Sequence, residues 1–223
     1  MGKLIVIEGT DASGKETQTK KLYEHLLQIN KNVKKISFPN YDSPACEPVK
    51  MYLAGKFGEN PLQINPYPVS AMYAIDRYAS YKMDWGTFYN EEGIIVTDRY
   101  VTSNMIHQGS KINDPIEKEK YLDWLKDLEY NKILIPKPDI VVFLNMPTYM
   151  AVKLMKERDN KITGAKEKDI HEKNILYLEN SYQNACEISK KYAWEEIHCL
   201  DGDRLKSIEE IAKEVFDKVK NVL

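Results

Sequence analysis

The sequence predicts an α/β protein in which helices cover both faces of a five-stranded parallel sheet. Along the 223 residues, five apolar runs of strand length alternate with longer stretches of helical spacing. Three runs are nearly continuous in Ile, Val, Leu and Phe, as a strand covered on both faces requires. Strands that alternate with helices in this way favour parallel pairing.

The predicted strands are residues 4–7, 33–37, 94–97, 140–144 and 196–200. The first helix is predicted over residues 14–29, because Leu22, Leu26 and Ile29 share one face. The last is predicted over residues 207–222 by the same spacing. Prolines punctuate the connections without clustering into a linker, so we expect a single domain over residues 1–223.

Composition and charge exclude several classes of protein. No apolar run approaches the roughly 18 residues that a membrane span needs. A net charge of -2 leaves no overall basic field for a nucleic-acid backbone. The apolar run after Met1 is interrupted by Glu8 and is too short for a signal peptide, so we expect a cytoplasmic protein. Three cysteines without CxxC spacing indicate free thiols.

A glycine-rich segment lies directly between the first strand and the first helix. Such a loop binds phosphate when its backbone N–H groups turn inward, a helix N-terminus faces the anion and a lysine reaches the terminal phosphates. The segment therefore predicts a P-loop NTPase fold; a glycine turn without a ligand is the alternative. The predicted ATP-binding residues are Gly9, Thr10, Asp11, Ala12, Ser13, Gly14, Lys15, Glu16 and Thr17.

The position after Lys15 departs from the usual pattern. A Ser or Thr hydroxyl normally meets Mg²⁺ there, but this chain has Glu16, followed by Thr17. We expect Glu16 to coordinate Mg²⁺ directly or through water, together with Asp98. In the alternative, Glu16 points to solvent, and the nucleotide and Asp98 hold the metal.

Two further pairs of residues suggest binding chemistry. Asp98 and Arg99 follow the third strand, where an acid can serve the metal and an arginine can grip a second phosphate. The alternative for this pair is a capping aspartate and a surface arginine. Tyr73 and Arg77 lie one helical turn apart, where a ring could stack on a base and an arginine could bond its carbonyl edge. Tyrosines at this spacing are also common in cores.

Together these motifs resemble the thymidylate kinase family over essentially the whole chain. The most specific segment is residues 98–104, Asp-Arg-Tyr-Val-Thr-Ser-Asn, continuing to Gln108 and Gly109. It is similar to the family's Asp-Arg-Tyr/His signature with a serine three residues later. The resemblance implies an enzyme that transfers the γ-phosphate of ATP, with Mg²⁺, to dTMP, giving ADP and dTDP for dTTP biosynthesis. It also implies a homodimer.

The resemblance assigns roles position by position. The implied catalytic residues are Asp11, Lys15, Arg99 and Arg158. The implied dTMP-binding residues are Asp11, Tyr41, Tyr73, Arg77, Arg99, Ser103, Asn104, His107 and Gln108. Within this set, Tyr73 is expected to stack on thymine and Arg77 to bond a thymine carbonyl.

Three departures from the family pattern qualify these roles. His107 stands where the family often has a tyrosine near the sugar, and it is equally interpretable as a helix-face residue. The phosphate loop lacks an arginine, so the catalytic cation is expected from a short mobile lid at about residues 156–169, with Arg158 as the candidate. The family's Asp-Arg-x-Glu element reads Asp-Ile-His-Glu at residues 169–172, without the arginine.

Two other functions fit the same loop. One is a kinase for another pyrimidine monophosphate or for a deoxynucleoside, against which the segment from Asp98 to Gln108 argues. The other is a non-catalytic P-loop nucleotide-binding switch, because a fold does not determine a function. A switch needs a water-positioning residue or a partner-facing loop, and the sequence indicates neither.

Overall fold

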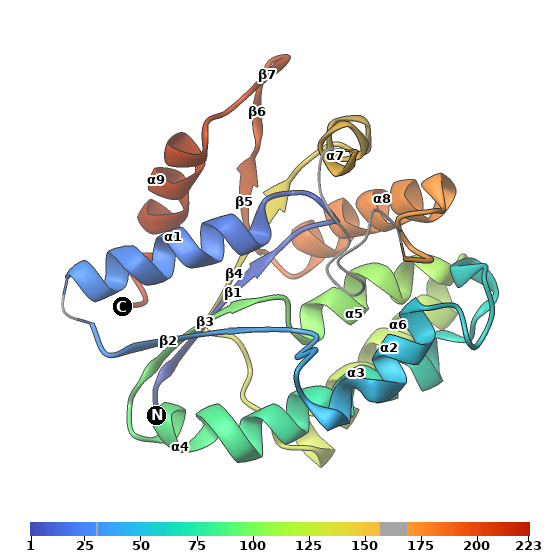
Figure 1. Ribbon diagram of the computed structural model, residues 1–223, viewed down its shortest axis with the longest axis horizontal. Coiled ribbons are helices and arrows are strands. Elements are labelled where there is room, and N and C mark those ends of the chain that lie inside the picture. The colour runs from blue at the N-terminus through green and yellow to red at the C-terminus, as the bar shows by residue number, and fades with distance from the viewer. Residues whose placement is uncertain (30, 157–168) are drawn as a thin grey trace.

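Five parallel strands form the central sheet in the order β2-β3-β1-β4-β5 (Figure 1). The computed structural model describes residues 1–29, 31–156 and 169–223. The strands are β1 Lys3–Glu8, β2 Val33–Ser37, β3 Ile94–Asp98, β4 Ile140–Asn145 and β5 Glu195–His198. The predicted parallel sheet is confirmed, and the three nearly continuous apolar runs form its buried centre.

Helices fill the connections between the strands. They are α1 Lys15–Gln28, α2 Glu47–Leu53, α3 Pro66–Ser80, α4 Gly86–Asn90, α5 Val101–His107, α6 Pro115–Lys126, α7 Thr148–Met155, α8 Ile175–Lys191 and α9 Ile208–Val219. Single 3₁₀ turns occur at Pro44–Cys46, Pro61–Gln63 and Gly109–Lys111, and π-helical segments at Tyr81–Trp85 and Asp127–Lys132. No helix in these described parts of the chain is long and apolar enough to cross a membrane.

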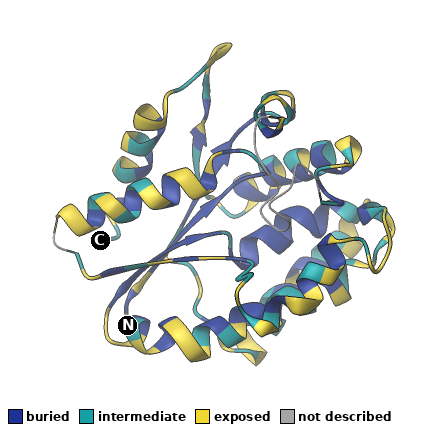
Figure 2. Ribbon diagram, viewed as in Figure 1, coloured by how far each residue is buried: buried dark blue, intermediate teal, exposed yellow. Residues whose placement is uncertain are grey.

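The helices cover both faces of the sheet, as the sequence predicted. On one face, Leu26 of α1 and Val215 of α9 belong to one apolar cluster with Ile5 of β1. On the other face, Met105 of α5 and Leu122 of α6 belong to a second apolar cluster with the strands. In Figure 2 the central strands are buried, whereas most of the helices around them carry both buried and exposed residues. Burial on both faces explains why these strand sequences do not alternate.

The last predicted strand is corrected at both of its ends. Residues 196–200 were expected to form one strand, but β5 covers Glu195–His198 and the chain then leaves the sheet. A short antiparallel hairpin follows, with β6 Leu200–Asp201 paired to β7 Arg204–Leu205. Gly202 lies in its turn with a φ of 59°, a conformation that glycine adopts readily. The predicted run therefore covers most of β5 and the start of β6, which Cys199 separates.

A buried ion pair joins α3 to the π-helical segment after α6. Arg77 donates from Nε and Nη2 to the two carboxylate oxygens of Glu129, at 2.7 and 2.5 Å. Both side chains are almost completely buried, at 1% and 0% exposure. Because neither charge is hydrated, each depends on the other for its compensation.

We predict that Arg77→Met will lower the free energy of unfolding by about 3–5 kcal/mol, because it leaves the Glu129 carboxylate buried and unpaired. The double variant Arg77→Met/Glu129→Leu should recover most of this loss. Urea denaturation measures both. Lys120→Met, at the exposed pair with Glu117, is the control and should change little. An equal loss in the single and double variants would contradict the prediction.

Candidate active site

The loop between β1 and α1 is tightly closed. Gly14 has a φ of 86° and turns the chain into α1. A Cβ atom at Gly9 would stand 2.4 Å from Ser13 Oγ and 3.1 Å from the Leu144 carbonyl oxygen. Both glycines are therefore needed for this path, as the sequence predicted for a phosphate-binding loop.

The loop presents polar groups that suit a phosphate. Lys15 is buried, and its Nζ folds back to donate to the Thr10 carbonyl oxygen at 2.7 Å. Burial lowers the pKa of Lys15 to about 8. Within the described part of the chain, the buried hydroxyls of Thr10 and Ser13 have no hydrogen-bond partner. Bound phosphate oxygens would satisfy such donors.

Glu8, at the end of β1, is a structural residue of the site that sequence reasoning missed. Its fully buried carboxylate accepts from the Tyr100 N–H at 3.2 Å, from Thr102 Oγ1 at 2.7 Å and from Ser103 Oγ at 2.9 Å. Burial raises its pKa, against the opposing effect of Arg99. The only sequence signal for Glu8 was that an acidic residue ends an otherwise apolar strand. Glu8 ties the first turn of α5 to the phosphate loop.

Arg99 bridges the phosphate loop and the start of α5. It lies between β3 and α5 with a φ of 66°, a strained value for a residue with a side chain. Its Nη2 is paired with the Asp11 carboxylate, while Nη1 lies 2.9 Å from His107 Nε2 and 3.4 Å from Ser103 Oγ. Burial opposes ionisation of Asp11, yet the guanidinium beside it holds the pKa of that carboxyl well below its usual range.

A pocket beside this ion pair is partly open to solvent and encloses about 460 Å³ of empty space when its open part is counted. Every predicted acceptor-binding residue except Arg77 lines it. The lining consists of Asp11, Pro39, Tyr41, Leu53, Tyr73, Arg99, Ser103, Asn104, His107, Gln108, Asp169 and His171. Residues from six separate parts of the chain thus meet in one place, and their roles toward a nucleotide stay predictions.

Arg77 is the exception, and the structure gives it other partners. Besides the pair with Glu129, its Nη1 donates to the Tyr100 carbonyl oxygen at 3.3 Å. Tyr73, one turn earlier on α3, does line the cavity. The two residues share a helix face, but the guanidinium extends into the core. Contact between Arg77 and a base stays a prediction.

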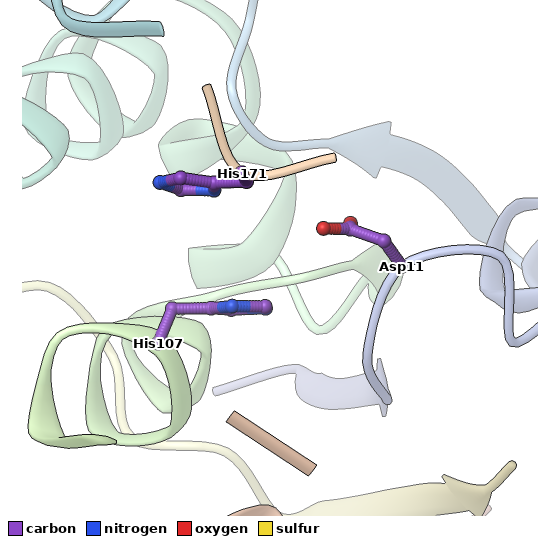
Figure 3. A group of neighbouring side chains, drawn as sticks. All are labelled: Asp11, His107 and His171. Atoms are coloured by element: carbon purple, nitrogen blue, oxygen red, sulfur yellow. The ribbon is translucent and has the colours of Figure 1, made fainter. Parts of the chain in front are cut away.

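Asp169 and His171 are cavity residues that the sequence reasoning did not select. The sequence pointed to this segment through the end of the expected lid at residue 169 and through the missing arginine of residues 169–172. Burial raises the pKa of Asp169 to about 7 and lowers that of His171 to about 3. Burial and the neighbouring Arg99 also lower the pKa of His107 well below its usual value. Both imidazoles are therefore neutral near pH 7, and they lie close to Asp11 (Figure 3).

The expected metal ligands lie at the same end of the sheet. Asp98 ends β3 and is buried, and its Oδ1 has no hydrogen-bond partner among the described residues. Glu16 is exposed in the first turn of α1. An unpartnered carboxylate oxygen beside a phosphate loop fits a hard divalent cation. Arg158 and most of the expected lid lie outside the described residues.

Comparisons with known proteins agree with this geometry. The family model for thymidylate kinase matches residues 7–215. The thymidylate kinase of Schizosaccharomyces pombe is 24% identical over 221 residues, covering 99% of this chain and 93% of that protein. The human thymidylate kinase is 29% identical over 153 residues, 68% of this chain and 65% of that protein.

A solved structure shows the same fold. The thymidylate kinase of Candida albicans superposes with a TM-score of 0.73 at 20% identity, covering 99% of this chain and 92% of that one. Because the sequence identity is low, this structural match supports the fold alone. The family model, in contrast, spans nearly the whole sequence and includes both the phosphate loop and the cavity residues up to His171. The chain therefore belongs to the thymidylate kinase family.

Proposed function

We propose that this protein transfers the γ-phosphate of ATP to dTMP, producing ADP and dTDP for dTTP biosynthesis. The observation that carries the proposal is the position of the acceptor cavity next to the phosphate loop, with Arg99 and Asp11 at their boundary. Two phosphates bound on either side of this pair would lie close enough for direct transfer. Membership of the thymidylate kinase family supports the same reaction.

Positioning and charge neutralisation dominate this chemistry. The acceptor phosphate is already a nucleophile, so no general base is needed, but two polyanions must be brought together. Lys15 would bind the donor phosphates and Arg99 the acceptor phosphate, and we propose Arg158 as the cation that completes the site. Mg²⁺, held by Asp98 and Glu16, would neutralise further charge on the donor phosphates when bound.

The lining of the cavity suits a thymine or uracil base. Tyr73 packs edge-on against Tyr52, with ring centroids 6.5 Å apart, which fixes its ring for stacking. The amide nitrogen of Asn104 donates to the Ser70 carbonyl oxygen at 3.4 Å. Its amide oxygen then remains to accept a hydrogen bond, which suits the N3–H of thymine or uracil and not the unprotonated N3 of cytosine.

We propose further that residues 1–223 form one kinase domain with a lid at about residues 156–169, and that the protein is a cytoplasmic homodimer. The lid and the homodimer rest on the resemblance to the family, whereas the single domain rests on the pattern of prolines and the location on the short apolar run after Met1.

The acceptor is tested by ADP release from ATP and Mg²⁺ with dTMP, dUMP, UMP, CMP, AMP or GMP, beside a reaction without acceptor. We expect rapid turnover with dTMP, weaker turnover with dUMP, and little with the others. Fast turnover with CMP or UMP would favour a different pyrimidine monophosphate kinase. ADP release that no acceptor stimulates would favour the nucleotide-binding switch.

We predict that Arg99→Ala lowers kcat/KM for dTMP by about 10²–10³-fold, because the acceptor phosphate loses a preorganised cation. ATP affinity, measured by calorimetry, should change much less. Arg204→Ala is the matched control, because that arginine pairs with Asp201 and Glu210 at the surface. Turnover of dTMP at the wild-type rate in the Arg99 variant would refute the assigned role.

We predict that Asp98→Asn and Glu16→Gln each raise the Mg²⁺ concentration needed for half-maximal activity, because each removes a charged oxygen ligand. Glu24→Gln, on the same helix as Glu16, serves as the control. Magnesium titration at fixed ATP and dTMP measures the effect. If only the Asp98 variant responds, Glu16 is not a ligand and the nucleotide and Asp98 hold the metal.

A further inference from the structure

Three side chains at the cavity have the composition of a transition-metal site. One potential ligand atom from each of Asp11, His107 and His171 lies within 4.8 Å of the others. Figure 3 shows the two imidazole rings nearly parallel, with the carboxylate reaching toward them from one side; the ring centroids are 6.0 Å apart and the planes differ by 10°. Two imidazoles and a carboxylate bind Zn²⁺ or Fe²⁺ in many proteins. The neighbours of the histidines decide whether this set can do so.

The partner of His107 determines which ring nitrogen carries its proton. Arg99 Nη1 lies 2.9 Å from His107 Nε2, and a guanidinium can only donate hydrogen bonds. Nε2 therefore accepts, and the proton of the neutral ring resides on Nδ1. Within the described residues, this buried Nδ1 has no hydrogen-bond partner.

A two-step chain of hydrogen bonds determines the tautomer of His171. Lys111 Nζ donates to the Tyr52 hydroxyl oxygen at 3.0 Å, and that oxygen lies 2.8 Å from His171 Nε2. In its ammonium form Lys111 can only donate, so the Tyr52 oxygen accepts from it. Among the hydrogen bonds of the described residues, His171 Nε2 is the acceptor left for the Tyr52 O–H, which therefore donates to Nε2. The proton of His171 is then also on Nδ1. Tyr52 is fully buried, so no solvent competes for its hydroxyl.

Both imidazoles are therefore unsuitable as metal ligands in this arrangement. A metal ligand needs a free lone pair, and a metal-bound histidine normally donates its other N–H to an acceptor. Here each Nε2 lone pair is occupied by a donor, and each Nδ1 carries hydrogen. The cluster instead offers two neutral N–H groups next to the Arg99 guanidinium, at the wall of the acceptor cavity.

We infer that Tyr52 and Lys111 are positioning residues, which hold His171 beside His107 as a neutral N–H donor to oxygen atoms of the acceptor nucleotide. The identity of that nucleotide rests on the proposed function, whereas the tautomers do not. The buried Nδ1–H of His107 has no partner among the described residues, which is unfavourable, and oxygens of a bound monophosphate could accept from it and from the Nδ1–H of His171. Arg99 already supplies positive charge here. The neutral imidazoles can therefore orient the acceptor through hydrogen bonds without adding charge.

The tautomers are measured by ¹⁵N NMR of the protein labelled at histidine, which contains only His25, His107, His171 and His198. The spectra are recorded at pH 6, because burial lowers the pKa of Lys111 to about 7 and its ammonium form then predominates. His107 and His171 should each show a protonated Nδ1 and an unprotonated Nε2 without nucleotide. A His171 that is cationic or protonated at Nε2 would overturn the inference.

Variants separate positioning from packing. Tyr52→Phe and Lys111→Met should each allow His171 to populate both neutral tautomers and should leave the His107 signals unchanged. Lys111→Arg keeps a cation that can only donate, so His171 should stay protonated at Nδ1 in that variant. Tyr182→Phe is the control, because it removes another tyrosine hydroxyl, one that donates to Asn145 at 2.9 Å outside the cavity lining.

Kinetics of the same variants test the role toward the nucleotide. We expect Tyr52→Phe and Lys111→Met to raise KM for dTMP about three- to tenfold with little change in kcat, as loss of one hydrogen bond to the bound acceptor would. If His171 populates both tautomers in these variants but KM for dTMP is unchanged, the role toward the acceptor is overturned. If the wild-type protein transfers phosphate to no monophosphate, the proposed function fails, while the NMR result still decides the tautomers.

Discussion

The parallel pairing of β1 with β3 is the constraint on which the site depends. Its register places Ile7 opposite Asp98, so the segments that follow both strands leave the same edge of the sheet. Parallel strands always bring their carboxyl ends together, and ligands of open α/β sheets collect at that edge. As a result, Asp11 and Arg99, 88 residues apart in the sequence, form an ion pair between the phosphate loop and the acceptor cavity.

Burial makes the charges at this edge interdependent. Glu8, Asp11 and Asp98 face Lys15 and Arg99 in a region with little access to water. An isolated buried charge is strongly unfavourable, so each acid is stabilised by its cations and each cation by its acids. Bound nucleotides would add negative charge to a network that already holds two fixed cations. Such preorganisation is the main contribution a protein makes to phosphoryl transfer.

The two arginines on this side of the molecule have separate roles because their partners differ. Arg77 lies in the core, where Glu129 and the Tyr100 carbonyl oxygen accept from it, so it stabilises the packing of α3. Arg99 is partly exposed at the cavity and shares its donors between a carboxylate, a hydroxyl and a neutral imidazole. Weak neutral partners are readily exchanged for a phosphate, whereas a buried carboxylate is not.

The sequence by itself determined the features that depend on local order along the chain. Continuous apolar runs predicted the buried strands, and the spacing of glycines and Lys15 predicted the phosphate loop, because both follow from the backbone of a few consecutive residues. The motif that begins at Asp98 predicted five of the twelve residues that line the cavity, because these five lie on α5 and the turns next to it.

Only the tertiary structure decided which distant groups meet. Arg77 pairs with Glu129, 52 residues later, and His171 bonds to Tyr52, 119 residues earlier. Hydrogen-bond partners of this kind determine tautomers, pKa values and the direction of a guanidinium, and no local pattern encodes them. The end of β5 at His198 and the pairing of β6 with β7 were likewise not encoded in the apolar run. Local sequence therefore specified the elements and the loop, whereas long-range packing specified the electrostatic state of the site.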